Sequence, residues 1–106
     1  MRIDGEVVGK FQAADLADGI NLSEYATPMW RQAGELWDLI IRKNNIYPQR
    51  WQGVQLYPIP DWLADEHAEE KRRAEMARLD AEIADLERRI AEAKQPVAHR
   101  FEVTPV

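Results

Sequence analysis

The stretch MARLDAEIADLERRIAEA, residues 76–93, decides the fold of this chain. Its apolar residues recur at alternating intervals of three and four, the heptad pattern of a helix that packs against another helix along a narrow seam. Opposite charges lie four residues apart at Asp85 and Arg89 and, further upstream, at Glu69 and Arg73. Such pairs stabilise a helix along its exposed face. We therefore predict a long helix over residues 61–95, capped by Asp61. The seam residues are Met76, Leu79, Ile83, Leu86, Ile90 and Ala93.

The helix that covers this seam is predicted upstream, in residues 25–46. Thr27 before Pro28 is typical of a helix start, because a threonine side chain can cap free N–H groups and proline lacks an N–H that would be unbonded there. An apolar face of this amphipathic helix matches the seam in length. We expect Trp37 to be buried against the long helix, so that Trp37→Ala costs about 3–5 kcal/mol. The face comprises Ala33, Leu36, Trp37, Ile40 and Ile41, with Met29 and Trp30 preceding it.

Two segments without a helical pattern flank and join these helices. Residues 1–24 predict a β-hairpin about Asp4-Gly5, a strong turn dipeptide, followed by a short helical turn. Residues 47–60 contain three prolines, which interrupt regular structure, and several aromatic residues, which are too apolar for a solvated linker. We expect a packed connector that lies across the helices.

The C-terminal segment, residues 97–106, alternates polar and apolar side chains over 99–103 and predicts a strand. This strand is expected to pair with the N-terminal hairpin, because an isolated two-stranded ribbon is marginally stable. The 106 residues thus form one module. Its predicted fold class is α+β and mainly helical: an antiparallel helix pair with a small antiparallel sheet from the two termini.

Charge and hydropathy argue against nucleic acid and membrane as partners. The formal net charge is −5, and the densest basic run, residues 71–73, lies between acidic residues that neutralise it. A phosphate backbone requires a positive stripe instead, so we interpret this run as a solvated helix face. The longest apolar run, residues 39–41, is far shorter than a membrane span, and the N-terminus has no signal-peptide pattern. Without cysteine, disulfide and thiolate chemistry are excluded.

A search for catalytic, cofactor-binding and metal-binding residues yields no candidate site. Ser23 lies in no nucleophile motif and is expected to cap the short turn that follows it. His67 and His99 lack a carboxylate three residues upstream to orient them as bases, and His67 is expected to be solvated. His67 and Glu70 form one helical pair, fewer than the three or four ligands that a metal site needs. The aromatics of residues 47–62 could line a sugar or lipid groove, but covering the core is the preferred interpretation.

Several strings along the chain resemble the C-terminal, non-catalytic region of bacterial SGNH/GDSL-type hydrolases. That region has a "DG-x-VVG" hairpin, an "A-x-x-L" turn, a "GVNLA…TPM…QA" string and an Arg-Trp segment before a charged helix. The matching segments are residues 4–9, 13–16, 19–33, 50–55 and 99–102, so the resemblance covers nearly the whole chain.

The catalytic blocks of that family are absent here. SGNH hydrolases take a nucleophilic serine from a Gly-Asp-Ser block, oxyanion donors from Gly and Asn blocks, and a base from Asp-x-x-His. Neither Ser23 nor Asn21 corresponds to these groups. The resemblance therefore implies a non-catalytic module that packs against a hydrolase domain, extends its substrate cleft or mediates assembly.

Two functional hypotheses follow. The first is a non-catalytic accessory or interaction module whose partner is an SGNH/GDSL hydrolase domain. The alternative is an independent coiled-coil oligomerisation protein, in which copies pair through Met76, Leu79, Ile83, Leu86 and Ile90. Both hypotheses predict that the chain is not an enzyme by itself and needs no cofactor.

Overall fold

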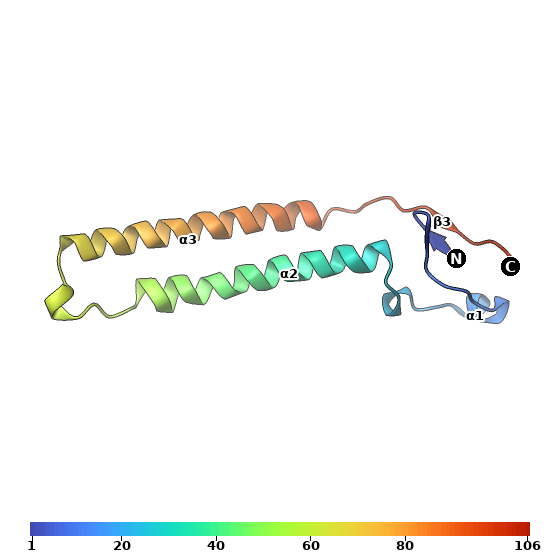
Figure 1. Cartoon of the computed structure of the whole chain (residues 1–106), viewed down its shortest axis with the longest axis horizontal. Helices are drawn as coiled ribbons and strands as arrows, with labels where there is room; N and C mark the ends of the chain where they lie inside the picture. The colour runs from blue at the N-terminus through green and yellow to red at the C-terminus, as the bar shows by residue number, and fades with distance from the viewer.

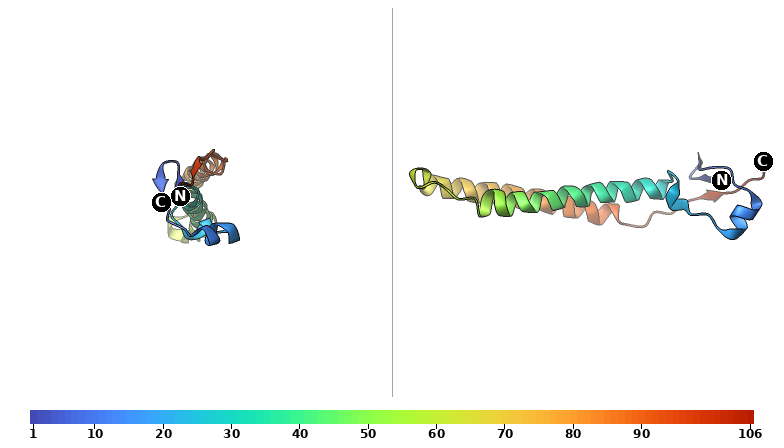
Figure 2. Two further views of the ribbon diagram at one scale, coloured as in Figure 1. Left: turned by 90° about the vertical axis from the view of Figure 1, so that its right-hand side faces the viewer. Right: turned by 90° about the horizontal axis from the view of Figure 1, so that it is seen from below.

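The computed structural model describes residues 1–106 as a rod of 75 × 20 × 16 Å. Two long helices, α2 (Pro28–Pro48) and α3 (Glu66–Ala93), lie side by side and run in opposite directions along it (Figures 1 and 2). Both termini lie at one end, together with a small sheet and the short helix α1 (Ala13–Asp18). The predicted fold class, mainly helical α+β with an antiparallel helix pair, is confirmed.

The core of the rod is the seam between α2 and α3. Leu79, Ile83 and Leu86 of α3 form a buried cluster with Leu39 and Ile46 of α2. The three α3 residues confirm the heptad prediction, and burial of each such side chain stabilises the fold by about 1.5–3 kcal/mol. Only seven of the 106 residues are buried, so the chain leaves most of its surface in contact with solvent.

The face that α2 turns to α3 differs from the predicted one. Trp37 is 64% exposed, so the prediction that it is buried against the long helix is wrong. Apolar residues cover more than half of the circumference of α2, and the periodicity alone could not select the stripe that faces inward. The least exposed positions of the helix body are Gln32, Leu36, Leu39, Ile40, Lys43 and Ile46.

Two of these inward positions are polar and bind α3 with the ends of their side chains. The Gln32 amide donates to the carbonyls of Ala93 and Gln95, at 2.9 and 2.8 Å. The Lys43 ammonium lies 4.0 Å from the carboxylate of Glu87. Long side chains of this kind cover apolar surface with their stems while the polar end stays near water. The polar residues therefore belong to the interface although a hydropathy pattern does not select them.

Helical structure continues beyond residue 46, the predicted end. Helix α2 includes Pro48 and leads directly into η2 (Gln49–Gln55), which has π-helical hydrogen bonding. Pro48 has no N–H to donate to the carbonyl of Asn44 and its ring crowds that group, and wider turns are a common response to such a disruption. The prediction of a non-helical connector is thus wrong for residues 47–55. Tyr47 and Trp51 are about half exposed, but the Tyr47 hydroxyl donates to Glu87 of α3 at 3.4 Å and Val54 packs against the core, so the expected packing across the helices is found in part.

Irregular backbone occupies residues 56–65 apart from the short turn η3 (Asp61–Leu63). The predicted cap at Asp61 is wrong, because Asp65 caps α3 with a carboxylate that accepts from the N–H of Ala68 at 2.8 Å. Extended backbone at Asp65 separates the two turns, and α3 therefore begins five residues later than predicted.

Arg72 holds the irregular segment against α3. Its guanidinium donates to the carbonyls of Gln55 and Tyr57, at 2.7 and 2.8 Å. Arg72 is therefore not part of a solvated basic face, as its place in residues 71–73 had indicated. It is also Arg72, not the predicted Arg73, that lies near Glu69, at 3.9 Å.

The sheet joins the two ends of the chain. Strands β1 (Arg2–Ile3), β2 (Glu6–Val7) and β3 (Phe101–Glu102) are antiparallel in the order β2-β1-β3. Positive φ angles at Asp4 and Gly5, 51° and 82°, give the tight turn expected of this dipeptide. The C-terminal strand pairs with the N-terminal hairpin as predicted, and Ile3 of the central strand is fully buried.

Candidate interaction surface

All four tryptophans of the chain are more than half exposed. The exposed fractions are 54% for Trp30, 64% for Trp37, 53% for Trp51 and 82% for Trp62. Large aromatic side chains normally contribute their area to a core or to an interface. Exposed apolar surface of this extent often marks an interaction site.

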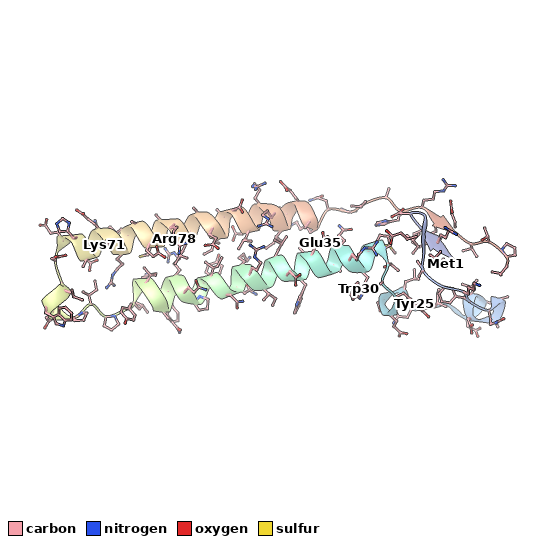
Figure 3. All side chains as sticks on the ribbon, viewed as in Figure 1. Met1, Tyr25, Trp30, Glu35, Lys71 and Arg78 are labelled. Atoms are coloured by element: carbon pink, nitrogen blue, oxygen red, sulfur yellow. The ribbon has the colours of Figure 1, made fainter.

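The first pair of tryptophans lies on the side of α2 that is opposite α3. At 3.6 residues per turn, the positions of Trp30, Gly34, Trp37 and Ile41 fall on one stripe, about half a turn from the buried Leu39. We call these four residues the outer α2 face. Trp30 projects away from α3 (Figure 3). Ile41 is 38% exposed, and the stripe has no partner within the chain.

A shallow cavity of about 590 Å³ lies between Trp30 and Trp37. Its floor is formed by Ala33 and Gly34, two residues with little or no side chain. A Cβ atom added to Gly34 would have no heavy atom within 4 Å outside its own helix backbone. The outer α2 face is therefore a notch between two indoles, one turn of helix on either side of Gly34.

A second apolar surface lies at the end of the rod away from the termini (Figure 1). We call it the distal aromatic cluster: Trp51, Leu56, Tyr57, Trp62 and Leu63, each at least half exposed. Its three aromatic residues, Trp51, Tyr57 and Trp62, do not cover a core, so the preferred interpretation of the aromatics in residues 47–62 is wrong for them.

A cavity of about 450 Å³ opens beside the distal aromatic cluster. Val54, Ile59 and Leu63 contribute apolar walls, and Lys71 contributes a cation. Prolines at 58 and 60 fix the backbone of one wall, because the φ angle of proline is restricted. A pocket of this size with fixed walls can receive one anchoring side chain of a partner.

His99 has a carboxylate partner that the sequence analysis missed. Its Nδ1 atom lies 2.7 Å from Oδ2 of Asp4, and the other carboxylate oxygen accepts from the N–H of Arg100 at 2.8 Å. Asp4 precedes His99 by 95 residues, so only the pairing of the terminal strand with the hairpin, which was predicted, could have indicated this contact. The hydrogen bond from His99, followed by that from Arg100, lowers the pKa of Asp4 below its ordinary value of 3.8.

The other candidate residues of the sequence analysis lie in local structure. The hydroxyl of Ser23 donates to Oδ1 of Asn21 at 2.7 Å, and the same atom accepts the N–H of Ser23. Asn21 is thus the cap of turn η1 (Leu22–Glu24), not Ser23 as expected. His67 is highly exposed, with Nδ1 at 3.7 Å from Glu70, and no group of three potential metal ligands is present.

Chemically, the structure therefore offers two apolar surfaces with aromatic side chains and one histidine–aspartate pair that joins strands. No helix has the length and apolar character needed to cross a membrane. In comparisons with known proteins, no family model, curated protein or solved structure matches the chain.

Proposed function

We propose that the chain is a non-catalytic protein–protein interaction module, related to the C-terminal region of SGNH/GDSL-type hydrolases. The observation that carries this proposal is the exposure of all four tryptophans on a chain that buries only seven residues. Tryptophan and tyrosine contribute most to binding energy where interfaces are measured residue by residue. The resemblance of nearly the whole chain to the non-catalytic end of that family makes a hydrolase domain the proposed partner.

The distal aromatic cluster is the proposed contact with this partner. It combines large exposed side chains with a pocket of about 450 Å³, so that it can both insert an anchor and receive one. Arg72 fixes the segment that carries the cluster by two hydrogen bonds to its backbone. An ordered surface loses less conformational entropy on binding than a flexible one, which favours a specific complex.

The alternative hypothesis, pairing of copies through the heptad seam, receives less support. Three of its five residues, Leu79, Ile83 and Leu86, are buried in the contact with α2. Pairing through them would first expose the apolar residues of α2 to water. We therefore prefer the interaction module.

Binding is tested with a hydrolase domain that contains a Gly-Asp-Ser block and is encoded beside this chain in its genome. We expect calorimetry to detect a complex, and Trp62→Ala to weaken it at least tenfold without lowering the midpoint of urea unfolding. Glu66→Ala, an exposed change near the same end of the rod, is the matched control and should bind normally. No heat of binding with any such domain would contradict the proposed partner.

The non-enzymatic part of the proposal has its own test. The purified chain should not hydrolyse short p-nitrophenyl esters above the uncatalysed rate. Hydrolysis that Ser23→Ala abolishes would show that the proposal is wrong, because Ser23 carries the only serine hydroxyl of the chain.

A further inference from the structure

We infer that the outer α2 face binds a second copy of this chain, in an antiparallel arrangement with two-fold symmetry. This inference concerns a different surface from the distal aromatic cluster and does not depend on a hydrolase partner. It is argued from the area of the face, its shape and its charged border.

The exposed apolar area of the face matches what a dimer requires. Trp30 and Trp37, each more than half exposed, with Ile41 and the adjoining Ala33, present about 400 Å². Two copies would together bury about 800 Å² of apolar surface, in the range of weak or transient interfaces. A patch of this size is at the upper limit of what a monomeric protein exposes. The face therefore has the dimensions of a modest interface.

The shape of the face is complementary to itself. Trp37 is a projection and Gly34, one turn before it, is a notch of the same stripe. A two-fold axis perpendicular to α2 between residues 35 and 36 places Trp37 of each copy over Gly34 of the other. The same rotation places Trp30 opposite Ile41. A two-fold interface requires this reciprocity, in which residue i meets residue j and residue j meets residue i.

Charges along the border of the face do not oppose this contact. Arg31, Glu35, Asp38 and Arg42 follow one edge of the stripe, two cations and two anions. A second copy therefore meets a border without net charge, and like-charge repulsion does not separate the copies. The heptad seam of α3 is not available as a competing surface, because Leu79, Ile83 and Leu86 are buried within the chain.

Sedimentation velocity of the full chain over a range of concentrations tests the inference. We expect a concentration-dependent shift from monomer to dimer, with a dissociation constant in the micromolar range. Gly34→Leu should weaken dimerisation at least tenfold, because the new side chain fills the notch. It should not destabilise the monomer, since the added atoms meet open space and leucine favours helix more than glycine does.

Two further variants make the result specific. Trp37→Ala should weaken the dimer as Gly34→Leu does, whereas Trp62→Ala, at the far end of the rod, should dimerise normally. A chain that remains monomeric at all concentrations overturns the inference. Dimerisation of Gly34→Leu equal to that of the unmodified chain also overturns it, because the contact would then lie elsewhere. Binding of the hydrolase domain by Gly34→Leu tests the proposed function separately.

The orientation is tested by cross-linking, because the chain contains no cysteine. In the antiparallel dimer, Ala33 of the two copies are about 8 Å apart along the helix axis, whereas Asn44 of the two copies are about 26 Å apart. We expect a short bis-maleimide to join copies of Ala33→Cys but not copies of Asn44→Cys. Efficient joining of Asn44→Cys would indicate parallel helices and overturn the arrangement.

Discussion

At the scale of single residues, Trp37 and Leu79 show that the larger side chain is not always the one that contributes more to the stability of the fold. Leu79 is 2% exposed at the centre of the helix contact, while Trp37 is 64% exposed. Leu79→Ala should cost about 2–5 kcal/mol, as truncations in a core do. Trp37→Ala should cost less than about 1 kcal/mol, in the range of surface changes. Urea unfolding of both variants, at a concentration where the chain is monomeric, measures the difference. A loss above about 3 kcal/mol for Trp37→Ala would show that the indole is buried in solution.

The pair Asp4 and His99 predicts a pH dependence. The hydrogen bonds from His99 and Arg100 favour the ionised carboxylate and hold the pKa of Asp4 below 3.8 in the folded state. The unfolded chain lacks these bonds, so their contribution to stability is fully present above pH 3.8 and is lost as the pH falls through the folded pKa. Asp4→Asn should therefore be less stable than the unmodified chain at neutral pH and show a flatter loss of stability below pH 4.

Asparagine is the suitable replacement at this position. Asp4 has a φ angle of 51°, a left-handed conformation that asparagine tolerates better than most residues, so the backbone is not strained by the change. A direct measurement is the NMR titration of the Asp4 carboxyl carbon. In His99→Gln, the pKa of Asp4 should move up toward 3.8, because the strongest contact is altered. An unchanged pKa in that variant would show that the pair does not form in solution.

At the scale of elements, Arg72 should matter more than its neighbour Arg73. Arg72 bonds the carbonyl of Gln55 at the end of η2 and that of Tyr57 just after it, whereas Arg73 is exposed. We expect Arg72→Met to cost about 1.5–3 kcal/mol, the usual range for hydrogen bonds that involve a charged group. Arg73→Met is the matched control and should change the free energy of unfolding by less than about 0.5 kcal/mol. Equal effects of the two changes would mean that the guanidinium contacts do not contribute.

For the two long helices, the sequence could predict the inward face of α3 but not that of α2. In α3 only one stripe is apolar, so Leu79, Ile83 and Leu86 had a single possible inward direction, and they were predicted correctly. In α2, apolar residues occupy most of the circumference, and Leu39 was omitted from the predicted face although it is buried. The inward stripe of α2 also carries Gln32, which bonds the backbone carbonyl of Ala93, and Lys43, which lies near the carboxylate of Glu87; such contacts between distant segments leave no local pattern.

The sequence identified residues of the candidate surface, but not the direction in which they face. The sequence indicated that Trp30 and Trp37 belong to an apolar face, but it placed that face in the core. In the structure Trp30 and Trp37 face solvent, and the notch at Gly34 lies between them. Asp4 and His99 were not linked, because strand pairing, and not spacing along the chain, brings them together.

At the scale of the whole molecule, the rod has two separate packing regions. The cluster around Leu39 and Leu79 contains no residue of the sheet, and Ile3 is buried at the other end. A radius of gyration of 23.2 Å, against about 13 Å for a compact chain of this length, reflects this separation. The polar contacts between the regions are exposed, such as the ion pair of Arg31 with Glu6 at 2.7 Å. The two ends should therefore unfold with different stabilities.

Deletion of residues 99–106 tests this separation. The deletion removes β3 and the Asp4–His99 contact, leaving β1 and β2 as a two-stranded ribbon that is marginal by itself. Hydrogen exchange at the amides of residues 2–8 should become fast, while the amides of α2 and α3 around Leu39 and Leu79 stay protected. Deletion of residues 104–106 alone, which are exposed and lie outside the strand, should change neither region. If the longer deletion instead abolished protection along α2 and α3, the sheet would be required for the helix pair to form. The rod would then be one cooperative unit whose stability depends on the joining of its two termini.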